Sequence, residues 1–279
     1  MSWLRFLTLK SCKQQNPDWD ITLYTHASTV CKQTWKDAIA QDFFSYDEID
    51  YTDQLADLGI NIVEWDLPVG IFPAGVWKNM APSHKSNVFK WHMLATVGGI
   101  YADLDILWTK PLDDFHKDIE DYDTVICFNK WLLIGLLASQ GNNPFFRKVL
   151  NTAVINYSAM RYQCVGVESV YVWLYSRRVY DMKGAEIIGI NWNKVLARPI
   201  WEDLQRAIPH MKFYNIPMNL IYPFDHNNLD KIFIETVGLP VETIGIHWYA
   251  GNPLSQSYNN LMNHLNYLQI DNTFCGHIG

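Results

Sequence analysis

Charged side chains are scarce in this 279-residue chain, at 18% of its residues, and neither sign prevails strongly. Lys and Arg number 22 against 29 Asp and Glu, which leaves a formal net charge of −7. Nucleic-acid binding relies on an excess of basic side chains, so this balance argues against a nucleic-acid partner. Hydrophobic residues reach 49%, which excludes an intrinsically disordered chain.

Cysteine pairs and long hydrophobic runs are also absent. The five cysteines are widely spaced and form no CxxC pair: Cys12, Cys31, Cys127, Cys164 and Cys275. This pattern excludes a disulfide framework and a zinc knuckle. The longest strongly apolar run, residues 131–138, is shorter than the roughly 20 residues of a membrane-spanning helix. Without a signal-peptide pattern either, we expect a cytoplasmic protein with no transmembrane segment.

Aromatic residues are plentiful by contrast, with 13 Phe, 12 Trp and 15 Tyr. Tryptophan combines a large apolar face with a single N–H donor. The surplus therefore fits either a bulky core or a site that stacks on sugar rings or bases.

Helical and extended patterns alternate along most of the chain. Helices are predicted from Trp3 to the Asn16-Pro17-Asp18 turn, from Ser83 to the Gly98-Gly99 pair, after Asn143-Pro144, and over 167–175 and 254–268, with helical pieces within 33–58. Strands are predicted over 21–24, 60–65, 100–107, 124–128 and 132–137, a Pro/Gly-rich loop over 68–82, and extended segments over 212–216, 220–222 and 243–248. No repeat or linker interrupts this order, so we expect one α/β domain over residues 1–279 with a decorated C-terminal half.

Two acids, Asp103 and Asp105, lie at the end of the predicted strand 100–107. In a strand, the i, i+2 spacing places both carboxylates on one face, and at a carboxyl end they converge on the crevice where α/β sheets bind ligands. Two adjacent like charges require a cation, which predicts Mg²⁺ or Mn²⁺ bound to oxygen ligands. Such a metal would bridge the diphosphate of a nucleotide donor. The alternative is a solvated strand end.

The surrounding stretch, SNVFKWHMLATVGGIYADLDILWTKPLDD from Ser86 to Asp114, resembles the sugar-binding region of family 32 DXD glycosyltransferases and the related glucosylating toxin domains. The positions in register are Ser86, Gly98, Gly99, Tyr101, Asp103, Asp105, Lys110, Pro111 and Leu112. Weaker collinear matches occur at residues 3–19 and 135–145, Tyr222-Pro223 and Ile246-His247-Trp248. The resemblance thus covers nearly the whole chain.

This resemblance implies a GT-A fold, in which a single Rossmann-like mixed sheet is flanked by helices. Residues 1–114 would form the donor-binding half and residues 115–279 the acceptor-side half. The implied activity is a metal-dependent retaining hexosyltransferase of the kind used in polysaccharide biosynthesis. It would take a hexose from a UDP- or GDP-sugar, with Mn²⁺ or Mg²⁺, to a glycan, glycolipid or protein acceptor.

By position in the family motif, Asp103 and Asp105 are the catalytic candidates. Asp105 would ligate the metal, and Asp103 would contact the donor with or without the metal. His247 would lie beside the diphosphate and metal, unless it is an ordinary core histidine, and Trp248 would close over the donor. The remaining donor-binding candidates are Ser86, Asn87, Lys90 and Tyr101. No strong protein base is implied, because the leaving phosphate can take the proton.

Two departures from the family pattern affect the donor site. The family's Ser-Asp-x-x-Arg is here Ser86-Asn87-x-x-Lys90, so a carboxylate becomes an amide and a bidentate guanidinium becomes a point charge. The family also opens with a strand that lines the base pocket, whereas this sequence starts at what resembles the following helix. Both departures predict altered donor binding.

These departures keep a second function open, a weak or inactive carbohydrate-binding relative of the same fold. A haloacid dehalogenase-type phosphotransferase also uses Asp-x-Asp, but it requires Thr or Val at the position where this chain has Leu107. It also requires a later acidic pair, which we cannot place in this sequence. A nucleotidyltransferase would need a Gly-rich basic loop near the N-terminus, which is not present.

Overall fold

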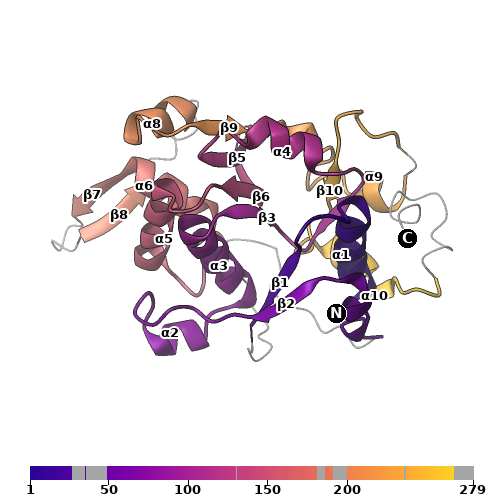
Figure 1. Ribbon diagram of the computed structural model, residues 1–279. Helices are drawn as coiled ribbons and strands as arrows, with labels where there is room; N and C mark the ends of the chain where they lie inside the picture. The colour runs from indigo at the N-terminus through magenta and orange to yellow at the C-terminus, as the bar shows by residue number, and fades with distance from the viewer. Residues whose placement is uncertain are drawn as a thin grey trace.

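The protein, described by a computed structural model over residues 1–26, 35, 49–129, 131–180, 186–190, 200–235 and 237–266, has a mixed α/β fold. Its central mixed sheet has the order β3-β6-β5-β9 and is flanked by helices (Figure 1). The strands are β3 (Gly99–Ala102), β5 (Thr124–Phe128), β6 (Leu132–Ser139) and β9 (Phe213–Asn215). β3 and β5 run antiparallel to β6, and β9 runs parallel to β5.

Three further pairs of strands surround this sheet. β1 (Thr22–Thr25) and β2 (Asn61–Glu64) are parallel, whereas β4 (Ile106–Trp108) with β10 (Gly245–His247) and β7 (Ser176–Tyr180) with β8 (Glu186–Ile190) are antiparallel. The single strand expected over 100–107 is therefore divided into β3 and β4. The division arises because β3 pairs with β6 while β4 pairs with β10, and the chain changes partners in a turn at residues 103–105.

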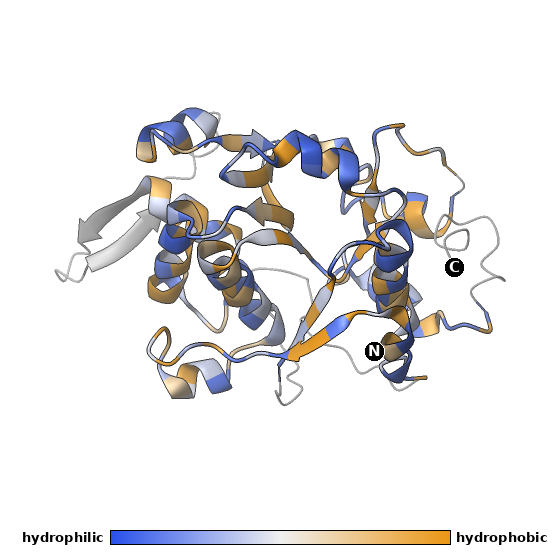
Figure 2. Cartoon of the chain, viewed as in Figure 1, coloured by the Kyte–Doolittle hydropathy of each residue, from blue (hydrophilic) through white to orange (hydrophobic). Residues whose placement is uncertain are grey.

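Helices lie on both faces of the central sheet. They are α1 (Trp3–Gln15), α2 (Ala74–Lys78), α3 (Pro82–Thr96), α4 (Asp113–Ile119), α5 (Pro144–Asn156), α6 (Val167–Tyr175), α8 (Ile200–Ala207), α9 (Asp230–Phe233) and α10 (Pro253–Leu261), with 3-10 turns η1 (Asp53–Leu58) and η2 (Met218–Leu220). Buried residues of α3, α5 and α6 share one hydrophobic cluster with β6, while α4 packs with β5 in another. In contrast, α1, α9 and α10 share a separate hydrophobic cluster with residues of β4 and β10. The outer helices α4 and α8 carry long hydrophilic stretches (Figure 2). No helix within the described residues is both long and apolar enough to cross a membrane.

The predicted glycine cap at the end of α3 is confirmed. The chain turns there into β3, which leads to the Asp-x-Asp turn. Gly98 and Gly99 have φ of +87° and +99°, a region that side chains disfavour. The backbone N–H groups of Val97 and Gly98 both donate to the Met93 carbonyl at 2.9 Å. A Cβ on Gly98 would lie 2.4 Å from the Gly141 nitrogen, so only glycine allows α3 to end against this turn.

Other predicted elements agree to differing degrees. β5 and α6 have the predicted bounds, whereas the loop 68–82 contains α2 and the segment 220–222 is no strand. The final helix ends at Leu261 rather than reaching 268, although residues 267–268 lie outside the described residues. Of the helical pieces expected within 33–58, residues 36–48 also lie outside them.

Candidate active site

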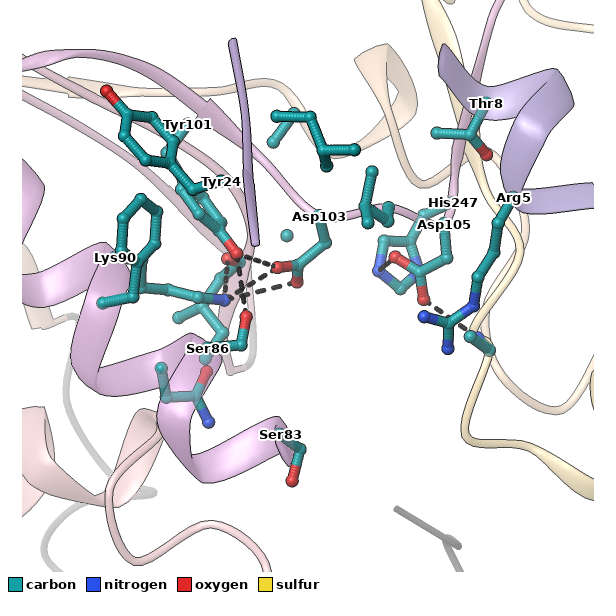
Figure 3. A pocket seen from close by; sticks show the side chains of 18 of the residues that line it. Arg5, Thr8, Tyr24, Ser83, Ser86, Lys90, Tyr101, Asp103, Asp105 and His247 are labelled. Carbon is teal, nitrogen blue, oxygen red and sulfur yellow. Dashed lines mark hydrogen bonds and ion pairs between the residues drawn. The ribbon is translucent and has the colours of Figure 1, made fainter. Parts of the chain in front are cut away.

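A cavity of about 1610 Å³ brings the predicted site residues together. It is lined by parts of α1, β1, α3, the 103–105 turn and the segment after β10. Figure 3 shows Ser86, Lys90 and Tyr101 on one side of this pocket and Asp105 and His247 on the other, with Asp103 between them. The split between β3 and β4 therefore places the Asp-x-Asp turn in the cavity wall.

Backbone hydrogen bonds fix both ends of this turn. The Asp103 N–H donates to the Gly135 carbonyl on β6 at 2.7 Å, and the Asp105 carbonyl accepts from the Trp248 N–H at 2.8 Å. β10 pairs with β4 so that His247 lies opposite Ile106. The register thus brings an imidazole from the C-terminal part of the chain next to the two acids.

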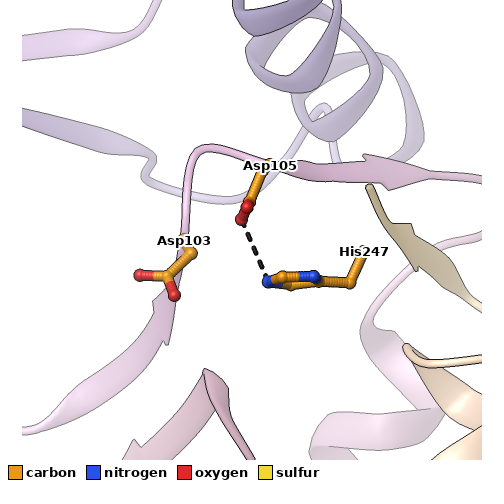
Figure 4. A group of neighbouring side chains, drawn as sticks. All are labelled: Asp103, Asp105 and His247. Atoms are coloured by element: carbon orange, nitrogen blue, oxygen red, sulfur yellow. Dashed lines mark ion pairs between the residues drawn. The ribbon is translucent and has the colours of Figure 1, made fainter. Parts of the chain in front are cut away.

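Asp103, Asp105 and His247 form a cluster whose candidate ligand atoms all lie within 4.8 Å of one another (Figure 4). His247 Nε2 is 3.1 Å from Asp105 Oδ1. Asp105 Oδ2 accepts from the Ala250 N–H at 2.9 Å, whereas the buried Oδ1 faces His247 and accepts no well-aligned hydrogen bond from the described residues. A buried carboxylate oxygen without a hydrogen bond is costly unless a cation compensates it. The donor set therefore fits a divalent metal ion, whose identity these residues leave open.

The electrostatics keep Asp105 in the form that binds a cation. Burial raises the pKa of its carboxyl, but the opposing effects of His247, the Ala250 N–H and the Arg5 guanidinium are larger and lower it to about 2. Asp105 is therefore ionised at neutral pH. Arg5 projects from α1 on the same side of the pocket as Asp105 (Figure 3).

Asp103 differs from Asp105 because a lysine already neutralises it. Lys90 Nζ lies 3.0 Å and 3.3 Å from its two oxygens and 3.1 Å from the Ile134 carbonyl oxygen. Lys90 is only 1% exposed, and its three ammonium hydrogens match these three acceptors. Lys90 therefore holds Asp103, and it also lines the cavity, so the expected contact with a donor stays a prediction.

Tyr101 supports Asp103 from the other side. Its hydroxyl donates to Asp103 Oδ1 at 2.7 Å and lies 3.1 Å from Ser86 Oγ. Burial, and then the Asp103 charge, raise the pKa of Tyr101 well above its usual value, so it remains a hydrogen-bond donor. Ser86 and Asn87 are half-buried on α3 and line the cavity, where a ligand can reach them.

The placement expected for Trp248 is wrong. Trp248 is fully buried and belongs to a hydrophobic cluster with α1, and its indole Nε1 donates to Thr8 Oγ1 at 3.3 Å. Adjacent residues of a strand point to opposite faces, so when His247 faces the cavity Trp248 faces the core. It therefore does not line the site.

Three residues at the cluster escaped prediction: Arg5, Gly135 and Tyr249. Tyr249 has a φ of +53°, uncommon for a bulky side chain, at the point where the chain turns to present the Ala250 N–H to Asp105. Gly135 had a signal, since glycine inside an apolar strand often marks a close approach. Nothing in the local sequence around Arg5 distinguishes it from an ordinary helix residue.

Comparison with known proteins gives one family match, which covers part of the chain. Residues 6–125 match the family model described as a glycosyltransferase sugar-binding region containing a DXD motif. A solved structure titled "PaToxG Glycosyltransferase" is similar with a TM-score of 0.39 and 15% sequence identity, over 75% of this chain and 73% of that chain. A search of curated proteins gave no match. The family match includes the Asp103–Asp105 turn but ends before His247.

Proposed function

We propose that this chain, whose residues 6–125 match the family model of a DXD-containing glycosyltransferase sugar-binding region, is a metal-dependent hexosyltransferase. Its donor would be a nucleotide diphosphate sugar and its acceptor a glycan, a glycolipid or a protein. The observation that supports this most is the cluster of Asp103, Asp105 and His247, whose candidate ligand atoms lie within 4.8 Å of one another in a cavity large enough for a nucleotide sugar.

Asp105, Asp103 and His247 would hold the metal. A set that includes an imidazole nitrogen suits Mn²⁺ better than Mg²⁺, which takes mostly oxygen ligands. When bound, the ion supplies positive charge that stabilises the leaving nucleoside diphosphate. Arg5, which already acts on the Asp105 charge, adds positive charge on the same side of the cavity.

The donor sugar would lie on the α3 side of the cavity. Ser86 offers a hydroxyl and Asn87 an amide to sugar hydroxyl groups, while Lys90 and Tyr101 hold Asp103 in place. We further propose that transfer retains the anomeric configuration, in keeping with the family resemblance. In that reaction the leaving phosphate accepts the proton of the acceptor, so no strong protein base is required.

A carbohydrate-binding relative without turnover is the second candidate. Two observations favour it: Asn87 replaces a carboxylate that would bind sugar hydroxyls, and the Lys90 ammonium is fully engaged by Asp103 and Ile134. Both features weaken donor binding while leaving the cation cluster intact.

A donor screen separates the two candidates. The protein is incubated with a panel of UDP- and GDP-sugars and Mn²⁺, and release of the nucleoside diphosphate is measured by chromatography. We expect release with at least one donor and a loss of about 100-fold or more in Asp105→Ala, because the ion's main ligand is removed.

The matched control is Asp118→Ala, which removes an exposed carboxylate of α4 outside the cavity and should retain full activity. If no donor is cleaved by the unaltered protein, the transferase is excluded. Binding of a nucleotide sugar under those conditions, measured by calorimetry, would support the non-catalytic relative instead.

A further inference from the structure

The imidazole of His247 lacks the support that usually orients a metal-binding histidine. In most such sites the second ring nitrogen donates to a carboxylate, a carbonyl or water, and this bond fixes the ring. His247 Nδ1 is buried and has no hydrogen-bond partner within the part of the chain that the structure describes. The direction of Nε2 toward Asp105 must therefore come from the packing around the ring.

Two tyrosine rings enclose that imidazole. Tyr249 meets it edge to face, with ring centroids 4.3 Å apart and an interplanar angle of 73°. Tyr222 lies on the ring with centroids 5.1 Å apart at 42°. These two contacts limit the tilt of the imidazole ring. They do not limit how closely the ring approaches β6.

Gly135 of β6 sets that limit, because the edge of the His247 ring lies directly on its backbone. A Cβ added to Gly135 would lie 2.8 Å from His247 Cδ2 and 2.9 Å from Nε2, the atom that faces Asp105. It would also lie 2.8 Å from the Tyr222 hydroxyl. Real Cβ contacts are not this short, so any side chain here must displace the imidazole.

Hydrogen bonds in turn fix the position of Gly135. Its N–H donates to the Tyr222 hydroxyl at 2.9 Å, and its carbonyl accepts from the Asp103 N–H at 2.7 Å. Tyr222 is 2% exposed, and burial holds its pKa well above the usual value, so the hydroxyl stays neutral. One glycine therefore contacts the backbone of one cluster acid, the ring of the cluster histidine and the tyrosine beside it.

We infer that Gly135 and Tyr222 are positioning residues for the cation site. Gly135 leaves the space that lets His247 Nε2 reach the cation shared with Asp105, and Tyr222 fixes the Gly135 backbone through its hydroxyl. This inference rests on the proposed function only in that Asp103, Asp105 and His247 hold a divalent ion.

Gly135→Ala tests the first part. Mn²⁺ affinity is measured without any sugar donor, from the electron paramagnetic resonance signal of free Mn²⁺. We expect affinity about 10- to 100-fold weaker than that of the unaltered protein, the usual effect of disturbing the support of a metal ligand. Gly75→Ala is the matched control, since a methyl there meets nothing within 4 Å and should leave the affinity unchanged.

A double-mutant cycle separates positioning from a general disturbance of β6. In the His247→Ala background there is no ring for the methyl to displace, so adding Gly135→Ala should weaken Mn²⁺ binding no further. An equal loss in both backgrounds would overturn the inference, because the methyl would then act without His247.

Tyr222→Phe tests the second part, and it decides the question if Gly135→Ala does not fold. It keeps the ring on His247 and removes only the hydroxyl, so we expect several-fold weaker Mn²⁺ binding. If both variants fold and bind Mn²⁺ as tightly as the unaltered protein, the inference is overturned. If Gly135→Ala does not fold, wild-type Mn²⁺ affinity in Tyr222→Phe alone overturns it. In both cases the proposed function stays intact. If the unaltered protein binds no Mn²⁺, both the metal-dependent function and this inference are wrong.

Discussion

The two acids of the turn are chemically different residues despite their symmetric motif. Lys90 and Tyr101 satisfy both oxygens of Asp103, whereas Asp105 Oδ1 faces the His247 imidazole and accepts no well-aligned hydrogen bond from the described residues. The charge of Asp103 is therefore balanced inside the protein. Asp105 is the acid that most needs a cation, which makes it the more sensitive position for metal binding.

Lys90→Met should destabilise the fold, because it removes the cation from a buried pair and leaves Asp103 charged. Removing one partner of such a pair costs about 3 to 5 kcal/mol, and the 26% exposure of the Asp103 side chain favours the lower end. Urea denaturation measures the loss. In the double variant with Asp103→Asn much of the stability should return; an equally unstable double variant would contradict the pairing.

The candidate residues were predictable from the sequence to different degrees. Asp103 and Asp105 are candidates from their spacing after an apolar run, and the family match includes that region. His247 came only from the resemblance, since a single histidine has no pattern of its own. Trp248 was misplaced because strand alternation turns it away from the side that His247 faces. Tyr249 had no signal, since its unusual φ depends on contacts made across the cavity.

At the scale of elements, the junction between β6 and α5 shows how one side chain can join a strand to a helix. Asn143 caps α5 by accepting from the N–H groups of Phe145 and Phe146 at 2.9 Å and 3.2 Å. Its amide also donates to the Asp123 carbonyl and the Thr124 hydroxyl next to β5, at 2.8 Å and 2.7 Å. The helix is thereby fixed to the central sheet at its first turn.

Asn143→Ala should cost about 2 to 4 kcal/mol of unfolding free energy, from the lost cap and from buried groups left without partners. Asn143→Ser can still cap the helix but cannot replace the amide donor, so its loss should be intermediate. Both values come from urea denaturation. Because Asn143 lies outside the cavity lining, Mn²⁺ affinity should not change; a change would show that the cluster depends on this junction.

The elements predicted best are those whose ends are set by neighbouring residues in the sequence. β5 and α6 are bounded by turn residues and by apolar periodicity, and their predicted ends agree with the structure. The strand predicted over 100–107 is divided because its first half pairs with β6 and its second half pairs with β10. Pairing with β10 is a long-range contact that no local pattern contains, and the same pairing brings His247 to the acids.

At the scale of the whole molecule, the cation cluster joins parts that are distant in the sequence. The Asp103–Asp105 turn lies between β3 and β4, whereas His247 ends β10 and Ala250 follows it, near the C-terminal end of the described residues. β10 has three residues, and its pairing with β4 is extended by one backbone hydrogen bond from Trp248 to Asp105 and one from Thr109 to Ile244. An ion held by both segments would add a further link between them, and its binding energy would add to the stability of the folded state.

Mn²⁺ should therefore raise the thermal unfolding temperature. A ligand that binds only the folded state at 100 times its Kd stabilises it by about 2.7 kcal/mol, which corresponds to an increase on the order of 5 to 10 °C for a domain of this size. Differential scanning fluorimetry with Mn²⁺, and again after chelation, measures the shift. Asp105→Ala should abolish it, whereas Asp118→Ala should keep it in full. Equal shifts in these two variants would mean that Mn²⁺ acts elsewhere on the surface, because Asp105 belongs to the cation cluster and Asp118 does not.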